Sequence, residues 1–249
     1  MKGVSKEPRW KTLPTTLSEG VELKKVLTNR SWSVRLEHGR RFTKQAVLGT
    51  QSPGILLLAS HGHWFPSVSS YGSSPGDQEA VRWAMRSSFV VMAGANWKVP
   101  AVVDTTPRMS GIRMEVPMRT ESTDPNPEGY LTAGELEAAD LNGTWLVILS
   151  GCSTGLGEFG DSDGVYGLQR AALAAGARNV LMTAWPIWSI TTSRLLPAIV
   201  ADGLDSGDLA TALSRRIAEA MRHERVDNLT ELDKILRRFG PYMLLTREL

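Results

Sequence analysis

The sequence has few of the residues that build disulfide scaffolds and metal clusters. It contains one cysteine, Cys152, and four histidines among 249 residues. A single cysteine cannot form an internal disulfide, and a lone thiol is typical of proteins in a reducing compartment. No Cys-x-x-Cys or His-x-x-x-His spacing, the usual sign of a zinc site, occurs in the chain. We therefore expect no disulfide framework, no metal ion and no other cofactor.

Long apolar segments and an excess of one charge are also missing. The start, MKGVSKEPRWKT, is charged and has no apolar stretch of the kind found in a secretory signal. The segment LAAGARNVLMTAW carries Arg178 and Asn179 and is too short to cross a bilayer. The net charge is +2, with acidic and basic residues interleaved, so we expect no direct binding to nucleic acid or a membrane. These absences predict a cytoplasmic protein.

The chain does have a regular alternation of apolar runs and helical patterns. Continuous apolar runs bounded by glycine are typical of parallel strands that are buried on both faces. The alternation predicts a three-layer α/β/α sandwich around a mostly parallel sheet. Strands are expected within residues 32–39, 54–62, 87–96, 144–155 and 178–187. Helices are expected within residues 15–29, 42–49, 131–143, 164–177, 191–203, 208–224 and 229–240.

Two of the expected helices begin with the same local pattern. Thr16 and Glu19, and again Thr132 and Glu135, have the Thr-x-x-Glu spacing of a capping box. In that motif the threonine hydroxyl and the glutamate carboxylate each satisfy a backbone N–H at the start of the helix. Both pairs are therefore predicted to lie at helix N-termini.

Residues 1–249 are expected to form a single domain, because no internal repeat or linker divides them. Residues 98–129 contain five prolines and have weak periodicity. A segment of this length without regular structure is usually functional, so an insertion or lid is expected there. The tail, residues 226–249, is predicted to be helical.

Reactive residues follow two of the apolar runs. His61 and Gly62 are the last two residues of the run at 54–62, and Gly151 and Cys152 lie near the end of the run at 144–155. Functional groups gather at the carboxyl ends of parallel strands, so His61 and Cys152 meet if their strands are neighbours. A thiol beside an imidazole ionises near neutral pH and becomes a nucleophile. The amides of Gly62 and Cys152 are candidate donors to an oxyanion, and the pattern predicts acyl transfer through a thioester.

The same residues permit plainer interpretations. A cysteine after an apolar run is often a small buried hydrophobic residue. His61, His63 and Cys152 together supply three ligands for zinc, although their spacing does not favour it. His63 on its own is interpreted as a surface or pocket residue and not as a second base.

Several separated motifs resemble those of CHAT domains, which belong to the caspase–separase–gingipain group of cysteine peptidases. The segments LLLASHG, MRSSFVVMAGAN, LTAGELEAADLNGTWLVILSGCSTGLGE and GVYGLQRAALAAGARNVLMTAWPI carry the resemblance, in the family's order, from about Leu13 to Met221. It implies a caspase-like fold, with the catalytic histidine and its glycine at His61 and Gly62 and the catalytic cysteine at Cys152. One departure is Gly151, where such domains commonly place alanine or another small residue, and this change is expected to be harmless.

The resemblance implies a cysteine endopeptidase that cuts a protein or peptide substrate, activated by a separate regulatory or recognition protein, or by a signal, in a defence or cell-death system. The alternative is a catalytically silent caspase-like interaction module. A third hypothesis is a hydrolase acting on a small ester or amide.

The substrate pocket is expected near the same strand ends. Glu158, Asp161 and Asp163 are candidates for selecting a basic residue before the cut. Asp161 and Asp163 are also suited to capping a helix that starts near Gly164. Trp64 and Trp185 flank the strand ends, and either shape an apolar pocket or belong to the core.

Overall fold

The structure is a computed structural model of the chain. It describes residues 10–64, 78–95, 129–151, 154, 158–160, 164–185, 189–222, 224 and 228–247. The expected insertion at 98–129 lies outside these residues except for Gly129, and so do Cys152, Asp161 and Asp163.

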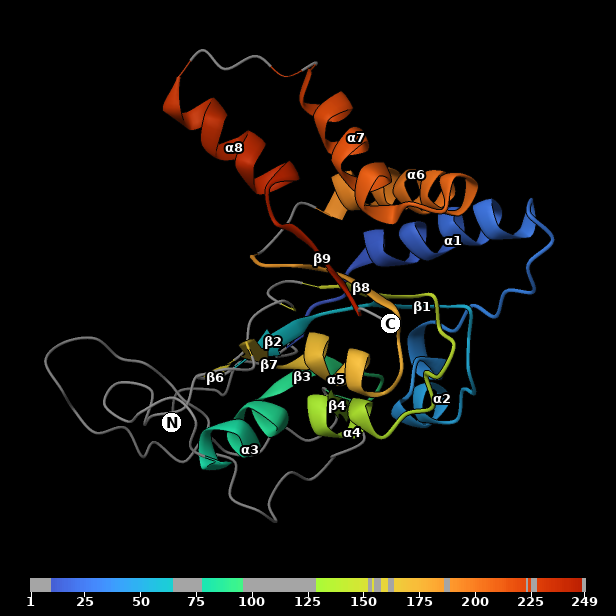
Figure 1. The fold of residues 1–249 in the computed structure, drawn as a ribbon, viewed down its shortest axis with the longest axis vertical. Helices are drawn as coiled ribbons and strands as arrows, with labels where there is room; N and C mark the ends of the chain where they lie inside the picture. The colour runs from blue at the N-terminus through green and yellow to red at the C-terminus, as the bar shows by residue number, and fades with distance from the viewer. Residues whose placement is uncertain are drawn as a thin grey trace, which may run out of the picture.

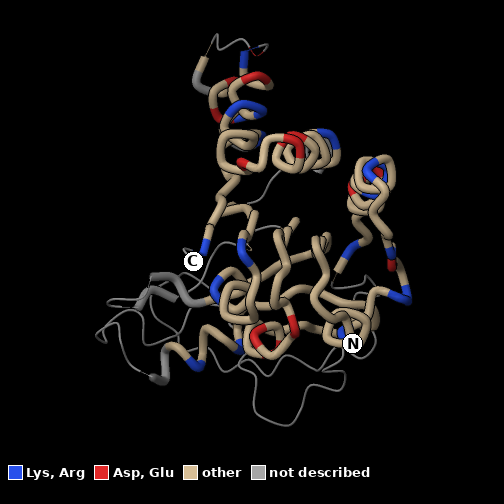
Figure 2. The backbone as a smooth tube through the Cα atoms, turned by 45° about the vertical axis from the view of Figure 1, so that its right-hand side comes forward, with Lys and Arg blue, Asp and Glu red and all other residues tan. Residues whose placement is uncertain are grey.

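A four-stranded sheet in the order β1-β5-β8-β9 forms the centre of the molecule (Figure 1). Its first three strands are parallel, and β9 pairs with β8 antiparallel at one edge. The four strands carry no charged residue, and apart from Glu158 in a separate hairpin the described Lys, Arg, Asp and Glu residues lie on helices and loops (Figure 2). The strands are β1 (Ile55–Ala59), β5 (Leu146–Ser150), β8 (Asn179–Thr183) and β9 (Tyr242–Thr246).

Helices cover both faces of this sheet, which confirms the predicted mostly parallel α/β fold (Figure 1). One layer comprises α1 (Pro14–Thr28), α6 (Ser189–Ser206), α7 (Leu209–Arg222) and α8 (Leu229–Phe239). The other comprises η1 (Gly39–Arg41), α2 (Lys44–Leu48), α3 (Gln78–Ser87), α4 (Ala133–Glu137) and α5 (Leu168–Ala174). A small sheet lies in this second layer, with β2 (Gly62–Trp64), β3 (Ser88–Val91) and β4 (Tyr130–Thr132). A separate hairpin pairs β6 (Glu158–Gly160) with β7 (Gly164–Tyr166).

Side chains of β5 alternate between two hydrophobic clusters, one on each face. Leu146 and Ile148 pack with residues of α1 and α6. Val147 and Leu149 pack with residues of α4 and α5. Because successive side chains of a strand point to opposite faces, Ser150 points to the α1 side, and this is confirmed by its hydrogen bond to that helix.

Three expectations about local structure were wrong. Residues 32–38 form no strand, and the helix expected from Gly164 begins at Leu168 instead, after strand β7. Helix α8 lies in the predicted helical tail, but the residues after it form β9. Gly240 and Pro241 form a turn after α8, and the apolar residues of β9 that follow complete the edge of the sheet.

The two capping-box predictions had different outcomes. Thr132 and Glu135 form a complete capping box at the start of α4. Helix α1 begins earlier than predicted, with Pro14 in its first turn, and the hydroxyl of Thr16 donates to the carbonyl of Leu13. Proline is favoured in the first turn because its fixed φ suits a helix and it lacks an N–H. Glu19 therefore lies inside the helix and does not cap it.

No helix among the described residues is long and apolar enough to span a membrane.

Candidate active site

The carboxyl ends of β1 and β5 lie side by side. Ala59 pairs with Ser150 in the parallel register, and the N–H of Ser60 donates to the carbonyl of Ser150 at 3.1 Å. His61 follows Ala59 by two residues, and Cys152 follows Ser150 by two residues. The register therefore brings the two segments that carry the predicted dyad to one edge of the sheet, although Cys152 itself lies outside the described residues.

Gly151 occupies the contact between these segments. A Cβ atom at this position would lie 2.5 Å from the carbonyl oxygen of Ser60 and 3.0 Å from the amide nitrogen of Gly62. Both atoms belong to the backbone and cannot move away independently. The glycine at this position thus has a steric reason in this chain.

We expect Gly151→Ala to lower the free energy of unfolding by about 1–2 kcal/mol, because the added methyl group overpacks the joined strand ends. Urea unfolding measures the loss. Gly134→Ala is the matched control, since its Cβ would lie 3.5 Å from the nearest atom, the carbonyl oxygen of Met85, within ordinary contact. Equal stabilities of the two variants would contradict the steric explanation.

Hydroxyl groups hold the backbone at Gly151. Its carbonyl accepts hydrogen bonds from Thr183 Oγ1 at 2.7 Å and from Thr154 Oγ1 at 3.2 Å. The Thr154 hydroxyl also approaches the carbonyl of Leu149 at 2.8 Å. Both threonines are buried, so these bonds are shielded from water. The sequence analysis did not identify Thr154 or Thr183, because a buried threonine after a strand has no distinctive pattern.

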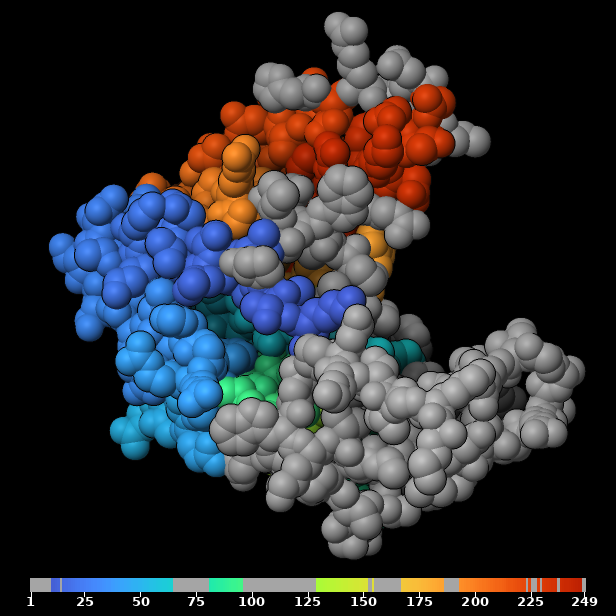
Figure 3. All heavy atoms as spheres, turned by 180° about the vertical axis from the view of Figure 1, so that it is seen from behind, coloured from blue at the N-terminus to red at the C-terminus, as the bar shows by residue number. Residues whose placement is uncertain are grey.

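His61 is held by the segment that precedes α1. Its Nε2 lies 2.7 Å from the carbonyl oxygen of Lys11, and the Trp10 ring lies 5.3 Å from the imidazole, between centroids. A carbonyl only accepts hydrogen bonds, so Nε2 carries the proton and Nδ1 is the basic nitrogen of the neutral ring. Figure 3 shows this segment in blue, crossing the molecule between the C-terminal helices and the teal and green residues.

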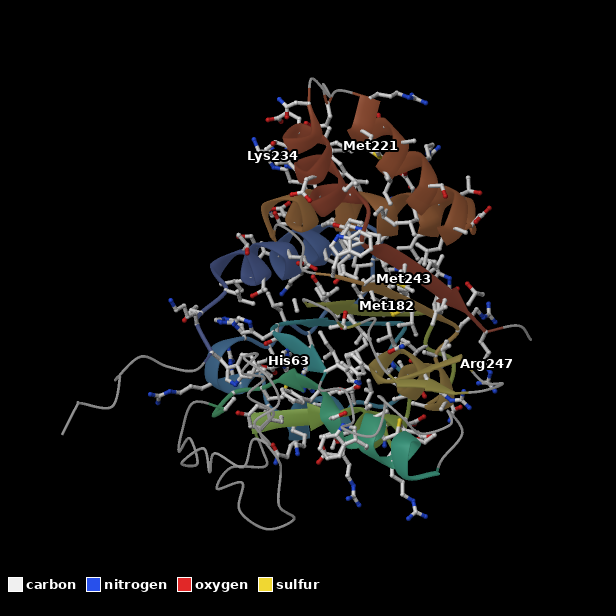
Figure 4. The ribbon with its side chains drawn as sticks, turned by 90° about the vertical axis from the view of Figure 1, so that its left-hand side faces the viewer. His63, Met182, Met221, Lys234, Met243 and Arg247 are labelled. Carbon is white, nitrogen blue, oxygen red and sulfur yellow. The ribbon has the colours of Figure 1, made fainter. Side chains whose placement is uncertain are left out.

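His63 lies in an aromatic cluster, on the side of the central sheet away from α1 (Figure 4). Its ring contacts Trp10 and Phe89, with centroids 6.2 and 6.0 Å apart. Trp10 in turn donates from Nε1 to the hydroxyl of Tyr130 at 3.2 Å. The cluster connects the segment that holds His61 to the small sheet.

The amide of Gly62 points away from β3. The N–H of Val91 donates to the carbonyl of His61 at 2.8 Å, which makes His61 and Val91 a hydrogen-bonded antiparallel pair. Gly62 and Val90 are the next pair in the register, so the N–H of Gly62 is directed outward from β3. A Cβ atom at Gly151 would lie 3.0 Å from the amide nitrogen of Gly62, so the end of β5 lies on the side to which this amide points.

The structure describes some of the predicted pocket residues but not all of them. Trp64 is half-buried at the end of β2, and its Nε1 has no hydrogen-bond partner in the described structure. Trp185 follows β8 and is 42% exposed, so it is not a core residue. Glu158 lies in β6, and Asp161 and Asp163 lie outside the described residues. Because Gly164 starts a strand, the helix that these aspartates were predicted to cap does not begin there.

Metal binding has no support in the described part of the chain, where no group of three His, Cys, Asp or Glu side chains is placed to hold an ion. This observation does not test the zinc hypothesis, because that site would include Cys152, which lies outside the described residues.

Glu19 is the residue near the site that the sequence analysis assigned wrongly. Its carboxylate oxygen Oε2 accepts a hydrogen bond from Ser150 Oγ at 2.9 Å. Only 2% of the residue is exposed. Burial raises the pKa of Glu19 to about 7, and the hydrogen bond from Ser150 only partly offsets this rise.

A mostly parallel sheet between helical layers, with candidate functional residues after neighbouring strands, is the architecture of caspase-like α/β proteins. The sequence model of the CHAT domain matches residues 3–239. The chain therefore belongs to the CHAT domain family, which is related to the caspase-like cysteine peptidases. No curated protein matches the chain at a significant level.

Proposed function

We propose that this CHAT domain is a cysteine endopeptidase that uses His61 and Cys152 as its dyad. The observation that carries the proposal is the register of β1 and β5, in which Ala59 pairs with Ser150. The segments that follow these two residues lie so close together that a side chain at Gly151 would clash with the backbone of Ser60 and Gly62.

In the proposed reaction, His61 Nδ1 takes the proton of the Cys152 thiol, and the thiolate attacks the carbonyl carbon of the scissile peptide bond. The amides of Gly62 and Cys152 stabilise the negative charge on the carbonyl oxygen. The imidazolium then protonates the departing amine, and a thioester to Cys152 forms. Water, deprotonated by His61, hydrolyses the thioester, which releases the acid product and restores the thiol.

The contact between His61 and Lys11 supports this assignment of the two ring nitrogens. A hydrogen bond from Nε2 to a fixed carbonyl selects one tautomer and one ring orientation, as the partner of a catalytic histidine does in other hydrolases. Lys11 lies outside the sheet, so a partner that moves the segment before α1 also changes the position of His61. This connection is compatible with activation by a separate protein or by a signal.

The substrate in this proposal is a protein or peptide that binds in extended form beside the sheet. Trp64, Trp185 and the acidic group of Glu158, Asp161 and Asp163 are proposed to shape the pocket for the residue before the cut. A cytoplasmic defence or cell-death system is the proposed setting.

Alkylation of Cys152 by iodoacetamide tests the dyad without any knowledge of the substrate. An unpaired thiol, with a pKa near 8.5, is only about 0.1% ionised at pH 5.5. Pairing with His61 raises the thiolate fraction by more than it lowers the nucleophilicity of the sulfur. We therefore expect His61→Ala to slow alkylation at pH 5.5 about tenfold, whereas His38→Ala, at an exposed histidine before η1, leaves it unchanged.

Because the chain has one cysteine, the alkylated cysteine found by mass spectrometry is Cys152 alone. A folded parent that reacts no faster than the denatured chain at pH 5.5 would instead favour the silent interaction module.

A further inference from the structure

Glu19 occupies a position in α1 at which the packing calls for an apolar side chain. Leu23 and Leu27 follow it at intervals of four residues, and both are buried in the cluster between α1, α6 and the central sheet. Glu19 continues this buried stripe toward the carboxyl edge of the sheet, with an exposure of 2%. A leucine here would add to the cluster, whereas a carboxyl group must lose its hydration.

The hydrogen bonds of Glu19 compensate only part of that cost. Oε2 accepts from Ser150 Oγ, whereas Oε1 is buried and has no hydrogen-bond partner. The described titratable and charged groups on the elements around Glu19 are not among the causes of its shifted pKa, which are burial and the Ser150 hydrogen bond. Those groups are Glu22, Lys24 and Lys25 on α1, Arg194, Asp202 and Asp205 on α6, and His61 after β1.

The partner of Glu19 connects it to the nucleophile. Ser150 is the last residue of β5, two positions before Cys152, and its carbonyl accepts the N–H of Ser60 at the end of β1. The side chain of Ser150 thus contacts α1 while its backbone contacts the segment that leads to His61. A side chain that holds Ser150 in place therefore also holds the start of the segment that carries Cys152 and the start of the segment that carries His61.

We propose that Glu19 is a positioning residue, present at a cost in stability because it holds Ser150, the last residue of β5, and thereby the start of the segment that carries Cys152. This inference rests on the proposed role of Cys152. Buried groups that are locally unfavourable occur mainly where they serve a site. Glu19 touches neither the substrate nor the reacting atoms in this proposal.

The test separates stability from reactivity by comparing Glu19→Leu with Glu19→Gln. Glu19→Leu removes the acceptor of Ser150 and completes the apolar stripe. We expect it to unfold at the same or a higher urea concentration than the parent at pH 8, yet to alkylate Cys152 about tenfold more slowly at pH 5.5. Glu19→Gln keeps an oxygen acceptor for Ser150, and its alkylation rate should stay within about twofold of the parent.

Ser150→Ala, which removes the donor, is the second variant. It should slow alkylation to the same extent, and the double variant with Glu19→Leu should be no slower than either single variant, because both break one contact. A Glu19→Leu variant that is folded and as reactive as the parent would overturn the inference, and so would a Glu19→Gln variant that loses as much reactivity as Glu19→Leu.

The parent distinguishes this failure from failure of the proposed function. A parent that reacts faster than the denatured chain, with no effect of Glu19→Leu, contradicts only the positioning role. A parent with the reactivity of a free thiol contradicts both.

Discussion

Peptide-bond cleavage will fall at least about a thousandfold in both Cys152→Ala and His61→Ala, and the double variant will be no slower than either. The reason is that the proposed nucleophile is the Cys152 thiolate that forms when His61 takes the proton, so either loss removes this nucleophile. A mixed peptide library, analysed by mass spectrometry after incubation with each variant, measures the effect. His38→Ala is the control, because His38 is exposed, precedes η1 and lies outside the dyad.

Losses that add up in the double variant would contradict a joint role for His61 and Cys152. Cleavage that persists in Cys152→Ala would contradict the peptidase mechanism as a whole.

The stability of the protein relative to Glu19→Gln will fall by about 2–3 kcal/mol between pH 5 and pH 8. Burial raises the pKa of Glu19 from 4.5 in the unfolded chain to about 7 in the folded protein, so the folded state binds the proton more tightly. The stabilisation is fully present below pH 4.5 and is lost as the pH rises through 7, where the buried carboxyl ionises. Glutamine does not titrate, and its stability therefore serves as the reference at each pH.

Urea unfolding of both proteins at several pH values measures this linkage. A difference in unfolding free energy that stays constant from pH 5 to pH 8 would show that Glu19 titrates alike in the folded and unfolded chain, which its burial beside Ser150 does not allow.

The central sheet was predictable because its strands have a recognisable local sequence pattern. The runs around Leu57, Ile148 and Leu181 are apolar throughout, as strands buried on both faces must be, and they form β1, β5 and β8. Their parallel direction follows from the helices between them. From this direction alone, the residues after β1 and β5 were expected at one edge of the sheet, and the register of Ala59 with Ser150 confirms that the two strand ends meet.

The role of Glu19 could not be predicted from the same kind of pattern. Thr16-x-x-Glu19 and Thr132-x-x-Glu135 are equivalent by spacing, and only the second forms a capping box. The difference arises two residues upstream, where Pro14 lies in the first turn of α1 and moves Glu19 into the helix. Which face of α1 is then buried depends on tertiary packing against α6, a helix that begins 175 residues after the start of α1.

The contacts that hold the two strand ends could not be predicted from the sequence either. The partner of His61 is the backbone carbonyl of Lys11, and a carbonyl is present at every residue. The carbonyl of Gly151 is held by Thr183, which is distant in sequence and close only because β8 pairs with β5. Strand β9 was missed because its apolar run follows a helix and a turn in a segment that was predicted to be helical.

The most direct measurement of the central claim is a comparison of new protein N-termini in a lysate of the cells that supply the gene, treated either with the parent or with Cys152→Ala. Such a lysate contains the natural substrate and any activating partner. The proposed dyad predicts that a defined set of new N-termini appears with the parent and is absent with Cys152→Ala, provided that the variant unfolds at the same urea concentration. The same set of N-termini with both proteins would contradict the claim that this CHAT domain cuts peptide bonds through Cys152.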